Sequence, residues 1–204
     1  SLVIETSTIG VPQSRMLAEC CAKRGIRFLD APVSGGIEGA EAGTLSAMVG
    51  GPKSDLEDAL PYLRAVASHV YHLGAHGSGA TAKLINQVIY LSYAAVFCEA
   101  TAFGAAEGLD VRVLVDALRQ SVGGQPLSTH WESHIETGDY SPGFHIRRAL
   151  KDLELGGEAI AGAGYDAPVF QSALRAFHRA AEAGYADCDI AALHASRTER
   201  TARV

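Results

Sequence analysis

The sequence predicts an α/β fold followed by an all-α part, and three observations support this. Short apolar runs alternate with helical stretches over residues 1–75, as strands and helices do in layered α/β proteins. From Gly79 onward the segments are long, alanine-rich and helical. Three glycines punctuate the chain between Gly74 and Gly79, as is typical of a boundary. We therefore predict one domain over residues 1–75 and a second over residues 76–204.

The first half predicts an incomplete parallel sheet. Its apolar runs have the short length and composition of buried strands, and they fall at residues 2–4, 26–29, 45–49 and 69–73. A helix over residues 11–24 has Pro12 in its first turn and Gly25 as its stop. A second helix covers residues 53–66. Because a parallel strand needs a neighbour and no element precedes residue 2, we expect the sheet to be truncated.

The second half predicts a series of helices. They fall at residues 79–107, 111–120, 146–161, 167–183 and 189–196, and the first of them has about eight turns at 3.6 residues each. Its most apolar stretch, residues 84–103, is interrupted by Asn86, Gln87 and Glu99. It therefore predicts a buried helix and no membrane span.

Composition excludes several classes of function. The chain is 48% hydrophobic and 20% charged, as ordinary globular proteins are. A formal net charge of -6 and the lack of a basic stripe argue against nucleic-acid binding. The four cysteines form neither a zinc pattern nor a C-x-x-C motif, so we expect no metal site. With no leader-like segment at its start, the sequence predicts a protein of the reducing cytoplasm.

A glycine-rich segment follows the second predicted strand, running from Asp30 through Ser34, Gly35 and Gly36 to Gly51. Glycine lets a backbone approach a ligand closely, and successive free N–H groups form an anion-binding nest. The natural guest is a carboxylate, to which Ser34 adds a hydroxyl donor. The plainer alternative is a connecting loop, which spacing alone favours because glycine loops are common punctuation.

The long predicted helix carries a polar stripe. Lys83, Asn86, Gln87 and Tyr90 lie at i, i+3, i+4 and i+7 and share one face. A lysine near a helix N-terminus feels the positive end of the dipole, which favours its neutral form and suits it to proton transfer. The spacing is equally compatible with an alternative in which Lys83 extends from the helix end into solvent and Asn86 and Gln87 are merely solvated.

Two further polar positions are ambiguous when taken alone. Thr8 follows the first predicted strand and is suited either to cofactor contact or to capping the next helix, where Ser and Thr are favoured. Lys151 and Asp152 lie on a predicted helix, where an exposed ion pair contributes little to stability. Neither position indicates a function without further context.

Together these motifs resemble those of the 3-hydroxyisobutyrate dehydrogenases and related β-hydroxyacid dehydrogenases, which include tartronate semialdehyde and glyoxylate/succinic semialdehyde reductases. Residues 30–51 match that family's substrate-binding motif almost residue for residue. The resemblance implies that Ser34, Gly35 and Gly36 bind a substrate carboxylate. It implies a catalytic role for Lys83, with Asn86 and Gln87 orienting it and contacting substrate.

The resemblance also implies a cofactor and a fold. NAD or NADP would lie with its nicotinamide ribose near Thr8, while Lys151, supported by Asp152, reaches the cofactor–substrate site. The fold would be a truncated Rossmann-type parallel sheet followed by a helical domain like the C-terminal domain of 6-phosphogluconate dehydrogenase. The family's G-x-G-x-x-G turn for pyrophosphate has no counterpart in the sequence, so we expect the chain to match only the family's later part.

These implications predict an NAD(P)-dependent oxidoreductase for a small 3-hydroxy acid or its semialdehyde. We expect a homodimer or homotetramer, because small residues along the long helix let helices approach closely, namely Gly104, Ala94, Ala95, Ala102, Ala105 and Ala106. One alternative is a non-catalytic helical dimerisation fragment. Another is an imine reductase, a relative that generally replaces the lysine found here as Lys83. A decarboxylating phosphogluconate-type enzyme would carry histidine in place of Asn86.

Overall fold

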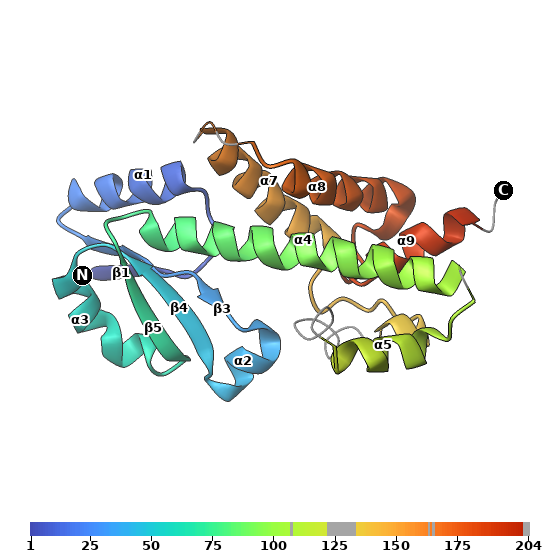
Figure 1. Cartoon of the computed structure of the whole chain (residues 1–204). Coiled ribbons are helices and arrows are strands. Elements are labelled where there is room, and N and C mark those ends of the chain that lie inside the picture. The colour runs from blue at the N-terminus through green and yellow to red at the C-terminus, as the bar shows by residue number, and fades with distance from the viewer. Residues whose placement is uncertain (107, 122–133, 163, 165, 202–204) are drawn as a thin grey trace. The chain divides into compact units, whose positions relative to one another are not determined.

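A computed structural model describes residues 1–106, 108–121, 134–162, 164 and 166–201 (Figure 1). The chain forms two compact units: unit 1 comprises residues 1–87 and 155–165, and unit 2 comprises residues 88–154 and 166–204. Strands occur in the first part of the chain and helices in the rest, which confirms the predicted fold class. The units divide within a long helix, after Gln87.

Unit 1 contains a five-stranded sheet in the order β1-β2-β4-β3, with β5 also paired to β4. β1 lies parallel to β2, in register from Leu2 opposite Arg27 to Glu5 opposite Asp30, and β4 lies parallel to β5. The strands are β1 (Leu2–Glu5), β2 (Arg27–Asp30), β3 (Val33–Ser34), β4 (Leu45–Gly50) and β5 (Ala67–Gly74).

The sheet is mixed: the predicted parallel pairs are present as β1–β2 and β4–β5, and antiparallel pairs that the sequence did not predict are added to them. β4 runs antiparallel to β3 and meets β2 antiparallel at the single pair Asp30 and Gly50. The cause is β3, which turns back after β2 and pairs Val33 with Ala47. Two residues are too few to show an alternating apolar pattern, so sequence reading passed over this strand.

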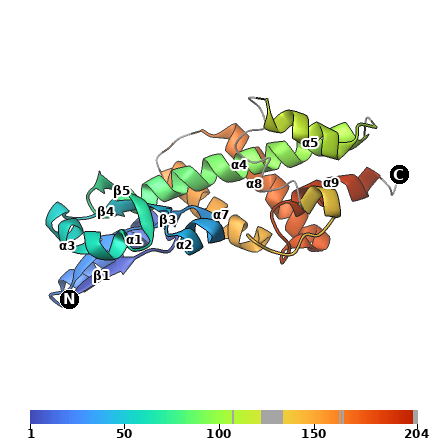
Figure 2. The same cartoon turned by 90° about the horizontal axis from the view of Figure 1, so that it is seen from below.

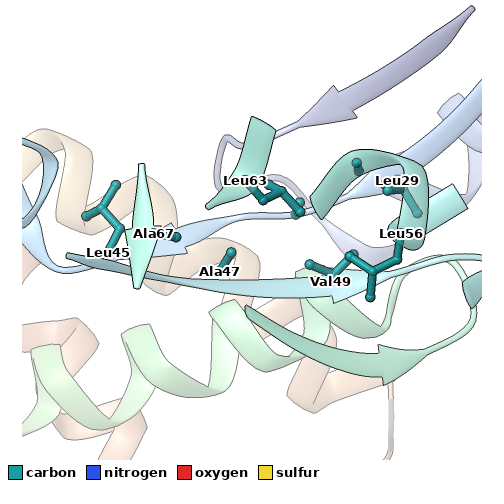
Figure 3. Close-up of a cluster of buried hydrophobic side chains, with 9 residues drawn as sticks. Leu29, Leu45, Ala47, Val49, Leu56, Leu63 and Ala67 are labelled. Atoms are coloured by element: carbon teal, nitrogen blue, oxygen red, sulfur yellow. The ribbon is translucent and has the colours of Figure 1, made fainter. Parts of the chain in front are cut away.

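Unit 1 also contains two helices that connect parallel strands, α1 (Val11–Ala22) and α3 (Lys53–Leu63), and one short helix, α2 (Gly36–Ala42). α3 packs its apolar face on the sheet, where Leu56 and Leu63 lie beside strand residues such as Leu29 and Val49 (Figure 3). Burying a side chain of this size stabilises a fold by about 1.5–3 kcal/mol. This core fixes the strands whose ends carry the candidate site.

The described residues of unit 2 are mainly helical. They include parts of two helices shared with unit 1, α4 (Ser78–Ala106) and α7 (Ile146–Gly162), together with α5 (Val111–Arg119), α8 (Pro168–Ala180), η1 (Ala181–Tyr185) and α9 (Ala192–Thr201). The Asp110 carboxylate caps α5 by accepting the Arg112 N–H at 2.8 Å. α5 lies beside the later turns of α4, where Leu114 packs on Gly104 (Figures 1 and 2). Across the described residues, no helix combines the length and the apolar character that crossing a bilayer demands.

Candidate active site

Within unit 1 the glycine-rich segment and the lysine helix meet. Asn86 on α4 directs its side-chain nitrogen to the Ser34 hydroxyl, 3.5 Å away and 52 residues earlier in the chain. The same nitrogen donates to Gln87 Oε1 at 3.0 Å. A separation of 3.5 Å is the long limit of a hydrogen bond, so the first contact records proximity more than binding strength. The two predicted motifs therefore form one polar site.

Lys83 lies one turn before Asn86 and is buried. Only 8% of Lys83 and 5% of Gln87 are exposed, while Asn86 is half-buried. Lysine is among the residues least often buried, because removing an ammonium from water is costly. This burial contradicts the alternative in which Lys83 snorkels to solvent beside a solvated Gln87.

Ser34, Gly35 and Gly36 lie where β3 passes into α2. Gly35 has φ 140° and Gly36 has φ 67°, conformations that side chains of L-residues rarely adopt. A Cβ on Gly35 would come within 2.9 Å of a Leu45 methyl group. Both glycines are exposed and Ser34 is half-buried, so this backbone is accessible to a small anion.

Asp30 is a site residue that sequence reasoning did not single out. It is fully buried at the end of β2, and its carboxylate accepts the N–H groups of Gly77 and Ala80, each at 2.9 Å. These two amides belong to the turn that opens α4. Asp30 thus ties the sheet to the start of the helix that carries Lys83.

The signal for this contact is present in the sequence. Gly77, Gly79 and Ala82 form a G-x-G-x-x-A pattern that follows β5 and opens α4. In dinucleotide-binding folds such a turn presents its amides to a pyrophosphate. Here the Gly77 and Ala80 amides bind the Asp30 carboxylate, so this turn holds an internal anion.

Thr8 lies half-buried in the loop between β1 and α1, near the carboxyl end of β1. The alternative that Thr8 caps α1 is wrong, because the N-cap residue is Gly10. The Gly10 N–H donates a hydrogen bond to Gln13 Oε1 at 2.7 Å, so a side chain of α1 itself caps the start of the helix.

In unit 2, Lys151 and Asp152 form an ion pair at 3.2 Å, with 57% of the Lys151 side chain and 6% of the Asp152 side chain exposed. The buried carboxylate therefore anchors an exposed ammonium near the start of α7. A second buried aspartate, Asp189, accepts the N–H groups of Gly143 and Phe144 at 3.0 and 2.8 Å and fixes the segment before that helix.

Tyr90 continues the polar face of α4 into unit 2. Partial burial raises the pKa of Tyr90 to about 12, and the negative charge of Asp189 acts in the same direction. The phenol is therefore a hydrogen-bond donor at neutral pH and does not act as a base.

The parallel β1–α1–β2 unit is the arrangement on which dinucleotide-binding folds are built, and Asn86 of the lysine helix lies next to Ser34 of the glycine-rich segment. Residues 1–74 match the NAD binding domain of 6-phosphogluconate dehydrogenase. Residues 77–196 match the NAD-binding domain of NADP-dependent 3-hydroxyisobutyrate dehydrogenase. The chain belongs to the 3-hydroxyisobutyrate dehydrogenase family of β-hydroxyacid dehydrogenases, as the motifs indicated.

Individual relatives agree with this assignment. The chain is 37% identical over 196 residues to an NAD-dependent L-serine dehydrogenase of Pseudomonas aeruginosa, covering 93% of the chain and 66% of the relative. A 3-hydroxyisobutyrate dehydrogenase from Salmonella typhimurium superposes with a TM-score of 0.92 at 31% identity, over 96% of the chain and 69% of that structure.

The Mycobacterium tuberculosis 3-hydroxyisobutyrate dehydrogenase with L-serine gives a TM-score of 0.83 at 32% identity, covering 100% of this chain and 70% of that structure. The chain spans 54–66% of the length of three curated relatives that it matches, among them the L-serine dehydrogenase.

Proposed function

We propose that the chain is the substrate-binding and proton-transferring part of an NAD(P)-dependent oxidoreductase. Its substrate is a small 3-hydroxy acid or the corresponding semialdehyde. The observation that carries the proposal is the approach of Asn86 to Ser34, on the same helix face as the buried Lys83. This arrangement gives one compact unit both an anion-binding loop and a proton carrier.

The proposal gives each group a task. Ser34 and the amides of Gly35 and Gly36 hold the substrate carboxylate, and Asn86 contacts the substrate beside them. Lys83 takes the hydroxyl proton during oxidation and returns it during reduction. Gln87 is more buried than Asn86 and accepts its hydrogen bond, so it orients the neighbouring amide. Positioning of this kind lowers a barrier by up to roughly 7–11 kcal/mol in the best cases.

Within unit 1, the position of Thr8 fits the nicotinamide end of a cofactor, because Thr8 lies at the carboxyl end of a parallel strand, the edge where such folds bind ligands. For unit 2, the resemblance implies a role for Lys151, whose ammonium is paired with the buried Asp152. When bound, the nicotinamide supplies or accepts the hydride. By contrast, the G-x-G-x-x-A turn of α4 does not fit the pyrophosphate, because Asp30 takes its amides.

The names of relatives support the substrate class. They include an NAD-dependent L-serine dehydrogenase, a 3-hydroxyisobutyrate dehydrogenase and an L-threonate dehydrogenase, all named for substrates with a carboxylate and a hydroxyl group. One relative is named for NAD, and a family model is described as NADP-dependent. We keep both nucleotides in the proposal.

We also propose a cytoplasmic homodimer or homotetramer. Three of the small residues expected to let helices approach closely, Ala94, Ala95 and Ala102, are buried within the chain itself and so do not form an interface between copies. Support comes instead from Ile85, Ile89 and Val96, which are exposed on α4. Exposed apolar side chains that follow one helix are typical of an interface.

Turnover of a defined panel of small 3-hydroxy acids tests the function. The protein assayed joins these 204 residues to a complete dinucleotide-binding part, and reduction of NAD⁺ or NADP⁺ is followed by absorbance. We expect turnover with at least one small 3-hydroxy acid and a large loss with its carboxamide, which keeps the hydroxyl and removes the charge. Equal rates with acid and amide would contradict the carboxylate site. Absence of turnover across the panel would support the non-catalytic dimerisation alternative.

A further inference from the structure

We propose that Asp30 is a positioning residue that seats the lysine helix on the sheet and sustains the proton affinity of Lys83. The inference rests on the proposed role of Lys83, but its physical content concerns only residues of unit 1. It assigns a task to the buried carboxylate that begins the glycine-rich segment, apart from the carboxylate-binding role proposed for Ser34, Gly35 and Gly36.

The seat is built by hydrogen bonds at both carboxylate oxygens. Asp30 Oδ1 accepts the Gly77 N–H and Oδ2 accepts the Ala80 N–H, both at 2.9 Å and both out of contact with solvent. Hydrogen bonds to a charged group contribute more than neutral ones, and a buried partner left unpaired is costly. The end of β2 thereby fixes the first turn of α4.

Two glycines show how closely the parts fit. A Cβ on Gly79 would overlap the Met48 carbonyl oxygen and come within 2.5 Å of the Asp30 carbonyl oxygen. A Cβ on Gly50 would lie 2.7 Å from Asp30 Oδ1. The helix start is therefore in backbone contact with β2 and β4, which leaves it little freedom to slide.

The position of the charge matters to Lys83. The first N–H groups of a helix carry partial positive charge, which disfavours a nearby ammonium. Lys83 lies three residues after Ala80 in α4, which corresponds to a rise of roughly 4.5 Å along the helix axis. The Asp30 carboxylate lies at that end of the helix and opposes its field. It thus favours the protonated form of Lys83.

Two other titratable side chains lie near the seat and are present in the wild type and in an Asp30 variant alike. A Cβ on Gly77 would lie 3.1 Å from Arg15 Nε of α1. His76 lies against Gly51 and has its Nε2 atom 2.9 Å from the Phe28 carbonyl oxygen. Because these groups are common to both proteins, a difference between wild type and an Asp30 variant reports Asp30.

The substitution Asp30→Asn keeps the size of the side chain and removes its charge. Its amide oxygen accepts one of the two N–H groups, while its NH₂ faces the other and leaves a buried donor without an acceptor. Loss of an opposite charge beyond direct contact shifts a titration by about one pH unit, so we expect the titration midpoint of Lys83 to fall by about that amount.

The chain is suited to a direct measurement because it has four lysines, Lys23, Lys53, Lys83 and Lys151. Lysine labelled with carbon-13 at the ε position gives one NMR signal for each, and Lys83→Arg assigns the signal of interest. Asp58→Asn is the matched control, since it removes a carboxylate that is 61% exposed. We expect Asp30→Asn to lower the midpoint of Lys83 alone and Asp58→Asn to leave it unchanged.

A folded Asp30→Asn protein in which Lys83 titrates as in wild type overturns the inference. Should that variant not fold, Asp30→Glu replaces it, because it keeps the charge while lengthening the side chain. We then expect a midpoint close to that of wild type, and a fall of a full pH unit in Asp30→Glu would overturn the inference.

Kinetics separate this inference from the proposed function. In the protein with a complete dinucleotide-binding part, Asp30→Asn should move the limb of the kcat pH profile that reports Lys83 to lower pH by the same amount. The KM for the carboxylate substrate should change little. If the NMR midpoint shifts but Lys83→Ala keeps its turnover, the proposed function fails and the inference about Asp30 stands.

Discussion

The Asn86 side-chain nitrogen lies 3.5 Å from the Ser34 hydroxyl, which joins the long helix to the end of strand β3. Both residues belong to unit 1, as does Lys83. The groups proposed to bind carboxylate and to move a proton therefore share one compact unit. Their spacing is fixed by the sheet and the seat at Asp30.

Replacing Ser34 should weaken substrate binding more than it slows chemistry. Ser34→Ala removes one hydroxyl donor to a charged carboxylate, a bond of about 1.5–3 kcal/mol, so we expect KM to rise about 10- to 100-fold. The kcat should fall less, because Lys83 is intact. Steady-state kinetics measure both constants, with Ser54→Ala on the exposed face of α3 as control. A kcat loss larger than the KM rise would contradict the carboxylate role.

Gly79 should be intolerant of any side chain. Gly79→Ala forces a Cβ against the carbonyl oxygens of Met48 and Asp30, so we expect the free energy of unfolding to fall by about 1–3 kcal/mol. Urea denaturation measures it. Gly162→Ala is the control, because a Cβ there meets nothing within 4 Å and alanine favours the helix. If both variants are equally stable, the close backbone approach at α4 does not exist in solution.

Stability should depend on pH through His194. Burial lowers the pKa of His194 below its ordinary value of 6.5, so the unfolded chain binds a proton at a higher pH than the folded chain. Stability is therefore lost as pH falls from about 6.5 toward the folded pKa. The slope from this group stays below roughly 1.4 kcal/mol per pH unit, the value for one full proton.

The free energy of unfolding, measured in urea between pH 8 and pH 5, tests the contribution of His194. His194→Gln should flatten the decline, whereas His69→Gln on the exposed strand β5 should leave it unchanged. A wild-type slope that persists in His194→Gln would assign the decline to other groups.

Assembly should depend on the exposed apolar residues of α4. Ile89 is 65% exposed between Ile85 and Val96, so Ile89→Glu places a charge within the proposed interface. We expect a dimer or tetramer in the wild type and a shift toward monomer in the variant, measured by light scattering at micromolar concentration. Val113→Glu on α5, where valine is 66% exposed, should not dissociate the assembly. A stable wild-type monomer would contradict the proposal.

Periodicity made most of the elements predictable. The helix predicted over residues 79–107 is α4 (Ser78–Ala106), and the strand predicted over 45–49 is β4 (Leu45–Gly50). Long amphipathic or apolar runs give a strong pattern, because many positions obey the same rule. The proximity of Ser34 to Asn86 could be predicted from the family resemblance but not from the spacing of residues along the sequence.

The features that the sequence did not predict are short elements and contacts between residues far apart in the chain. β3 has two residues and α2 is rich in glycine, so neither carries a readable period. Asp30 acts through backbone amides 47 and 50 residues away, and a local pattern can mark those amides but does not tell which group they bind. The G-x-G-x-x-A turn was the available clue, but its ligand is a side chain of the same chain.

Turnover of Lys83→Ala is the most direct measurement of the proposed chemistry, made in a protein with a complete dinucleotide-binding part. Loss of a general acid–base group costs about 10²–10⁴-fold, so we expect kcat to fall by that factor across pH 6 to 9. KM should change much less, because Ser34 and the glycine amides still hold the carboxylate. Wild-type turnover in Lys83→Ala over this pH range would show that Lys83 is a buried structural lysine and would contradict its assignment as the proton carrier.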